Sequence, residues 1–203
     1  MSDYPYSREI ADFVHNFLEE DDWNFYFDEQ EGVFRFDVGI ESRLNGISFN
    51  IHIALGGILI LASSPVASNP DDEVMMARMA EYLTRINYDI AMGNFEMDYD
   101  DGEIRYRFFV DTDGGLPSDG VIKDGIVTAI SLYKKIDEGL LGIVFTDMSA
   151  KQAYHCWKDC YRRQITKRIL EKAISEGEDK EFIDFLESFL DEEEPDVKTE
   201  ELN

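Results

Sequence analysis

The chain has 203 residues and a mass of 23.4 kDa, which fits one domain with a short appendage. Apolar residues make up 44% of it and aromatic residues 13%, which excludes a disordered protein. The 44 Asp and Glu residues against 19 Lys and Arg give a net charge of -25, which repels nucleic-acid phosphates and anionic lipid headgroups. The composition therefore argues against nucleic-acid and membrane binding, and it favours a basic partner.

The charge is distributed unevenly along the chain. Residues 1–150 carry a net charge of -19, residues 151–172 carry +5, and residues 176–203 carry -11. This pattern predicts an acidic body, a basic helical segment and an acidic C-terminal stretch. Residues 191–203 contain almost nothing that could be buried, so we expect an acidic disordered tail there.

Three features indicate a cytoplasmic protein. Cys156 and Cys160 lie close together in one segment and cannot form a disulfide framework, which suits a reducing compartment. The first residues lack the basic start and apolar run of a signal peptide. The longest apolar stretch, residues 58–62, is far too short to span a membrane.

Apolar spacing predicts a helix followed by strands in the first third of the chain. Ser7 is a suitable N-cap for a helix whose apolar face consists of Ile10, Phe13, Val14, Phe17 and Leu18. Alternating apolar and polar residues then predict antiparallel strands over residues 23–27, 34–40 and 47–53. Residues 58–61 are apolar on both faces, and they form either a central strand or a continuation of the third strand past Gly56 and Gly57.

A second helix and a hairpin follow. Asn69 as cap and Pro70 at the first position predict a helix whose apolar stripe is Met75, Met76, Met79, Leu83 and Ile86. Residues 95–99 and 104–110 alternate around an Asp-Asp-Gly turn, which predicts a β-hairpin. Residues 119–145 have the pattern of a third helix.

The C-terminal part is predicted to be helical. Ser149 and Gln152 form a capping box for a fourth helix, which ends at Gly177 before a short fifth helix. The apolar stripe of the fourth helix is Tyr154, Trp157, Tyr161, Ile165 and Ile169. Because the strands come in antiparallel blocks, we expect an α+β fold, a twisted antiparallel sheet with helices packed on one face.

The predicted order α-β-β-β-α-β-β-α resembles the fold of type III secretion chaperones, and the stretch from residue 87 to residue 113 resembles the YbjN-like family of bacterial regulators. The residues that carry this resemblance are Asn87 at a helix end, Gly93 and Phe95 at a strand start, Gly102 in a turn, and Arg105 and Arg107 in the next strand. The resemblance covers residues 7–147 and not residues 149–203. We therefore expect a YbjN-like domain over residues 1–148, a helical extension over 149–190 and a tail over 191–203.

Few residues suggest chemistry. Cys156 and Cys160, with His155 beside them, could supply half of a zinc site, but no second Cys/His pair exists to complete it. The acidic loops that begin at Asp98 and Asp111 resemble calcium loops but have Phe109 and Ile122 where a bidentate Glu is needed, so turns are the better interpretation. No nucleophile elbow, zinc-protease motif or phosphate-binding Gly loop is present, and we expect no enzyme activity and no cofactor.

The remaining candidate site is an interface. The second helix is apolar over a wider arc than one packed face needs, and this motivates a dimer interface made by Met75, Met76, Met79 and Leu83. The resemblance implies a non-enzymatic domain, often a homodimer, that binds another protein. We expect a chaperone-like or regulatory protein-binding domain with a basic partner or client; the alternative is a regulatory domain that senses a small molecule or peptide.

Overall fold

The computed structural model describes residues 5–191 and divides the chain into two compact units, Met1–Trp157 and Lys158–Asn203. The division falls after Trp157 instead of after residue 148, because Ala150, Ala153 and Trp157 at the start of the fourth helix are buried in the core of the first unit. The expected tail lies outside the described residues, except for Asp191, which ends the last helix.

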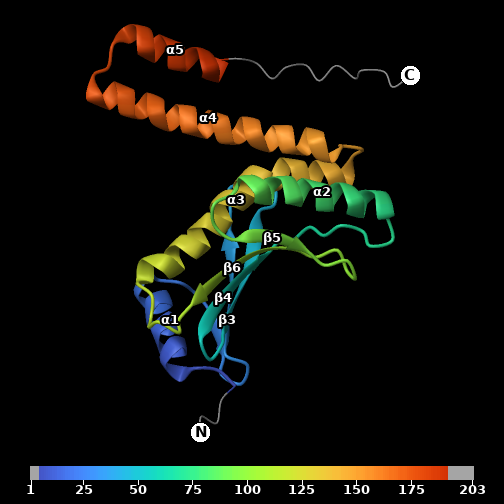
Figure 1. Cartoon of the computed structure of the whole chain (residues 1–203), viewed down its shortest axis with the longest axis vertical. Coiled ribbons are helices and arrows are strands. Elements are labelled where there is room, and N and C mark those ends of the chain that lie inside the picture. Colours follow the sequence, from blue (N-terminus) through green and yellow to red (C-terminus); the bar gives the residue numbers. More distant parts are fainter. Residues whose placement is uncertain (1–4, 192–203) are drawn as a thin grey trace. The chain divides into compact units, whose positions relative to one another are not determined.

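The first unit is a six-stranded antiparallel sheet with helices on one face (Figure 1). Its elements are α1 (Arg8–Glu20), β1 (Tyr26–Asp28), β2 (Val33–Gly39), β3 (Gly46–Ile53), β4 (Gly57–Ser63), α2 (Glu73–Asp89), β5 (Asn94–Met97), β6 (Ile104–Asp111), α3 (Asp119–Phe145) and the first turns of α4 (Ala150–Glu176). The strand order is β1-β2-β3-β4-β6-β5. The predicted α+β class is confirmed, and four strands precede α2 because β4 is a strand of its own between β3 and β6.

The core lies between the sheet and the helices. Alternate residues of each strand point inward, so that Phe36 and Phe49 stack at 5.0 Å between ring centroids. Tyr133 of α3 is fully buried and donates a hydrogen bond from its hydroxyl to the Ala62 carbonyl at 2.8 Å. Burial raises the pKa of Tyr133, so this hydroxyl keeps its proton and fixes α3 to the centre of the sheet.

Helix α2 begins three residues later than its sequence signals predict. Asp72 is the N-cap, and its Oδ1 accepts hydrogen bonds from the backbone N–H groups of Val74 and Met75 at 3.0 and 2.9 Å. The Asn69 Oδ1 instead accepts from the Asp71 N–H at 3.1 Å, so the segment with Pro70 forms a turn before the helix.

The proposed interface residues of α2 lie mostly inside the protein. Met76, Met79 and Leu83 are buried in the core, and Met75 is half-buried. The arc of apolar residues on α2 is wide because the helix packs against both α3 and β5 of the same chain. A dimer interface on this helix would have to use other side chains, such as the exposed Val74.

The second unit is a helical hairpin made by residues 158–176 of α4 and by α5 (Lys180–Asp191). Gly177 ends α4 as predicted, with a φ of 73° and a hydrogen bond from the Glu178 N–H to the Ala173 carbonyl at 3.0 Å. The Asp179 Oδ1 caps α5 by accepting from the Phe182 N–H at 2.8 Å. Ala173 and Leu186 are buried, and they mark the inner faces of the two helices.

Candidate functional site: a hollow at the open edge of the sheet

The two edges of the sheet differ, and the β5 edge is closed by a side chain. Asn87 at the end of α2 donates from Nδ2 to the Phe95 carbonyl at 2.9 Å, and its Oδ1 accepts from the Phe95 N–H at 2.7 Å. One amide side chain therefore satisfies both outward backbone groups of Phe95. No further strand can pair with β5 at this residue.

The residues that carry the family resemblance hold this hairpin together. Arg105 donates from Nε and Nη2 to Glu96 Oε2 at 3.1 and 3.0 Å, across the β5–β6 pair. Tyr106 donates from its hydroxyl to the Met92 carbonyl at 3.0 Å, and burial raises its pKa to about 12. Together with Asn87, these residues have structural roles in the described part of the chain.

Replacing Asn87 tests this closure. We expect Asn87→Ala to lower the free energy of unfolding by about 1–3 kcal/mol, because it leaves the Phe95 N–H and carbonyl without their partner. Asn94→Ala is the matched control, since Asn94 makes only a 3.4 Å contact with Glu96. Urea unfolding measures the difference, and amide exchange of Phe95 should accelerate only in Asn87→Ala. Equal effects of the two substitutions would contradict the assigned role.

The opposite edge is formed by β1 and is open. Strand β1 has only three residues, and its ladder with β2 ends at the pair Tyr26 and Arg35. Among the described strands, residues 36–39 of β2 pair with β3 alone. Edge strands with free backbone groups are the places where a further strand can add.

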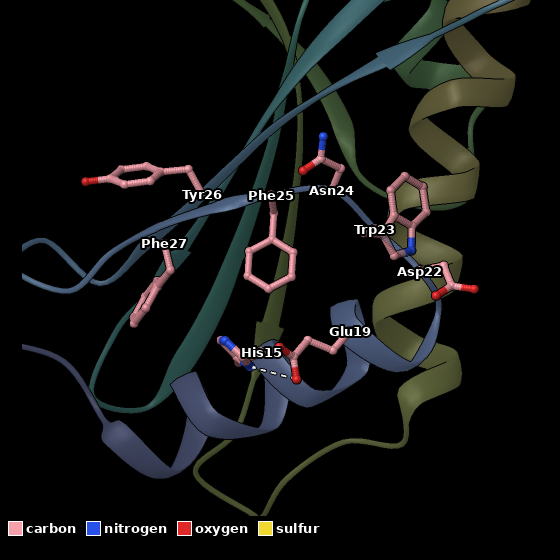
Figure 2. Close-up of a pocket in the computed structure, with 8 residues that line it drawn as sticks. All are labelled: His15, Glu19, Asp22, Trp23, Asn24, Phe25, Tyr26 and Phe27. Atoms are coloured by element: carbon pink, nitrogen blue, oxygen red, sulfur yellow. Dashed lines mark ion pairs between the residues drawn. The ribbon is translucent and has the colours of Figure 1, made fainter.

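A shallow hollow of about 770 Å³ lies beside this edge, between α1 and the segment that leads into β1 (Figure 2). Its lining consists of His15, Glu19, Asp22, Trp23, Asn24, Phe25, Tyr26 and Phe27. Phe25 and Phe27 point toward α1, whereas Asn24 and Tyr26 point away from it (Figure 2). Tyr26 is 63% exposed.

The wall of the hollow is aromatic and continuous with the core. Phe27 stacks on the buried Phe34 with ring centroids 4.2 Å apart. His15 meets Phe25 edge-to-face at 5.3 Å, and Trp23 lies 5.2 Å from Phe36. Because these half-exposed rings are fixed by buried ones, they form a preorganised apolar surface.

The rim of the hollow is acidic. Glu19 lies 3.7 Å from His15 Nδ1, and Asp22 is exposed at the end of α1. The neighbouring Asp21 is engaged within the protein, because it accepts hydrogen bonds from Lys123 Nζ at 2.7 Å and from Trp23 Nε1 at 3.0 Å. These two donors hold the pKa of Asp21 below its ordinary value. The rim suits a Lys or Arg side chain of a bound molecule.

The hollow was not predicted from the sequence, although three alternating aromatic residues after a helix with an exposed His were a usable signal. The predicted turns are confirmed: Asp98 and Asp111 each accept a hydrogen bond from the N–H two residues later, at 2.8 and 2.9 Å. Cys156 and Cys160 are not joined in a disulfide, and residues 5–191 contain no group of three His, Cys, Asp or Glu side chains that could hold a metal. Within the same residues, no helix is long and apolar enough to cross a membrane.

Comparison with known proteins gives one family. The YbjN family, described as "Putative bacterial sensory transduction regulator", matches residues 11–141. The crystal structure of YbjN from E. coli resembles this chain with a TM-score of 0.44 and 14% sequence identity, over 60% of this chain and 83% of that one. No curated protein matches the chain.

Proposed function

Because the chain belongs to the YbjN family of regulators, we propose that it is a non-enzymatic, cytoplasmic regulatory domain that binds an extended basic segment of another protein along β1. The regulatory role comes with the family. We infer that the domain acts by binding another protein, in a chaperone-like or regulatory role. The observation that carries it is the open edge at β1 beside an aromatic hollow with an acidic rim, opposite an edge that Asn87 closes.

The chemistry of this site suits strand addition. A partner segment that runs beside β1 can exchange main-chain hydrogen bonds with the free side of the edge strand, and these bonds supply affinity for any sequence. Specificity then comes from alternate side chains. An apolar residue can contact Phe25 in the hollow, and a Lys or Arg beside it can pair with Glu19 or Asp22.

A small-molecule sensor is the second candidate. The volume of about 770 Å³ is in the range of ligand sites, but the hollow is widely open to solvent, whereas such sites enclose most of a ligand's surface. An open hollow at a strand edge favours a peptide segment. A ligand that stays bound in native mass spectrometry, and that is lost in Phe25→Ala, would favour the sensor instead.

The main-chain part of the proposal can be tested at Asn24, which is exposed next to β1. Asn24→Pro removes a backbone N–H from the edge segment, and Asn24→Ala is the matched control that keeps it. With a partner recovered from the native cell, we expect Asn24→Pro to weaken binding about tenfold or more and Asn24→Ala less than about threefold. Circular dichroism checks that both variants are folded. Equal affinities of the two variants would contradict strand addition.

A further inference from the structure

The helical hairpin of the second unit exposes an apolar surface of its own. Seven large apolar side chains of the hairpin are between 37% and 56% exposed. Six of them form two stripes, Tyr161, Ile165 and Ile169 on α4 and Phe182, Phe185 and Phe189 on α5, and the seventh is Ile174. Scattered exposed apolar residues are normal, but stripes of this kind mark interaction surfaces.

The two stripes lie on one face of the hairpin. With about 100° per residue, the α4 stripe is displaced by roughly 110° from the inner face marked by the buried Ala173 and the half-buried Leu170, and the α5 stripe by roughly 70° from the inner face marked by Leu186. Counted along the chain, the two displacements have the same sense of rotation. Because the two helices run antiparallel (Figure 1), the same sense along the chain becomes opposite senses in a common view, and both stripes face the same side of the hairpin. We name this surface the hairpin face.

We propose that the hairpin face binds the same face of a second copy of this chain, forming an antiparallel four-helix bundle. Charge selects this occupant. Residues 158–176 of α4 carry six Lys and Arg and three acidic residues, whereas residues 178–191 carry six acidic residues and one Lys. A two-fold axis along the helices places each basic α4 over the acidic α5 of the other copy, so that one hairpin supplies both complementary charges.

The levels of the side chains along the hairpin agree with this arrangement. A shallow hollow of about 390 Å³ lies on α4, lined by Lys158, Asp159, Tyr161, Arg162, Ile165 and Thr166. Antiparallel pairing of Leu186 with the segment around Leu170 brings Phe189 level with residue 167, between Ile165 and Ile169. The two-fold axis keeps that level, so Phe189 of the second copy lies at the Thr166 end of the hollow. On the flank of the bundle, Lys172 then lies within about one helical turn of the level of Glu181 of the second copy.

This inference goes beyond the proposed function and does not depend on it, because it concerns a different unit and needs no other protein. The test is the mass of the full chain in solution, measured by light scattering. We expect the mass of two chains for the unchanged protein and of one chain for Phe185→Glu, which places a carboxylate in the centre of the apolar face. Ser188→Glu, on the outer side of α5, adds the same charge and should leave the dimer intact.

Two outcomes would overturn the proposal. The first is a single-chain mass for the unchanged protein at all concentrations. That mass is expected if the hairpin packs on the first unit of its own chain, or if it binds another protein instead. The second is a two-chain mass that Phe185→Glu does not change, which would place the dimer contact elsewhere. Because Phe185 is 56% exposed, its replacement should leave the helix content unchanged, and circular dichroism checks this.

A charge exchange tests the arrangement of the helices. We expect Lys172→Glu to weaken the dimer about threefold or more, because it sets like charges against each other on both sides of the two-fold axis. Adding Glu181→Arg to the same chain should restore the affinity, because both pairs are then reversed. A double variant that is as weak as Lys172→Glu would contradict the placement of α4 over the partner's α5.

Discussion

Met79→Glu is expected to unfold the first unit. The Met79 side chain is fully buried in the core between α2 and its neighbours, and a carboxylate there would lose its hydration without gaining a partner. The cost of an unpaired buried charge is several kcal/mol, which is comparable with the whole stability of a domain of this size. Near-UV circular dichroism should show the loss of the native signal, and calorimetry the loss of a cooperative transition.

Val74→Glu is the matched control on the same helix. Val74 is 59% exposed, so the same charge remains hydrated there and should change the free energy of unfolding by less than about 0.5 kcal/mol. A folded Met79→Glu variant that had merely lost a dimer would contradict the core position of Met79. It would support instead the interface of Met75, Met76, Met79 and Leu83 that the sequence pattern suggested.

Gly102→Ala is expected to cost roughly 2–4 kcal/mol of stability. Gly102 has a φ of 77°, which side chains rarely adopt, and an added Cβ would collide with the Ser68 carbonyl oxygen and lie 2.7 Å from its carbon. The colliding atoms belong to backbone that cannot turn aside, because the Ser68 N–H donates to the Gly102 carbonyl at 3.0 Å. The substitution should therefore separate the β5–β6 turn from the segment before α2.

Gly114→Ala is the matched control, because it replaces a glycine that makes no contact like the one between Gly102 and the Ser68 backbone. An added Cβ at Gly114 would meet no atom within 4 Å, and we expect a change of less than about 1 kcal/mol. Urea unfolding of the two variants, with amide exchange at Ser68, gives the comparison. Equal stabilities would show that the contact between Gly102 and Ser68 is not needed for the fold.

Local signals were sufficient for much of the fold. The N-cap at Ser7, the capping box of Ser149 and Gln152, and the stop at Gly177 are all present in the structure, because each depends on hydrogen bonds between near neighbours in sequence. The start of α2 was placed wrongly at Asn69, since two adjacent segments carried competing capping residues. Only the tertiary position of the helix decides between them.

Features that depend on distant contacts were not available from the sequence. The pairing of β4 with β6 joins strands that are separated by a whole helix and another strand. The stripe predicted on α4 divides between the two units: Trp157 is buried in the first core, whereas Tyr161 and Ile165 are exposed. The hollow depends on α1 lying against the edge segment; the alternating aromatic residues at positions 23, 25 and 27 indicate an apolar face there, but they do not specify which helix covers it.

The central claim is that the β1 edge receives a protein segment. A photo-crosslinking amino acid in place of Tyr26, which is 63% exposed beside β1, tests it directly in the native cell. The same replacement at Tyr88, 90% exposed at the end of α2, is the matched control. We predict one discrete protein adduct at position 26 that position 88 does not give. Identical adduct patterns at the two positions, or none at position 26, would contradict the account.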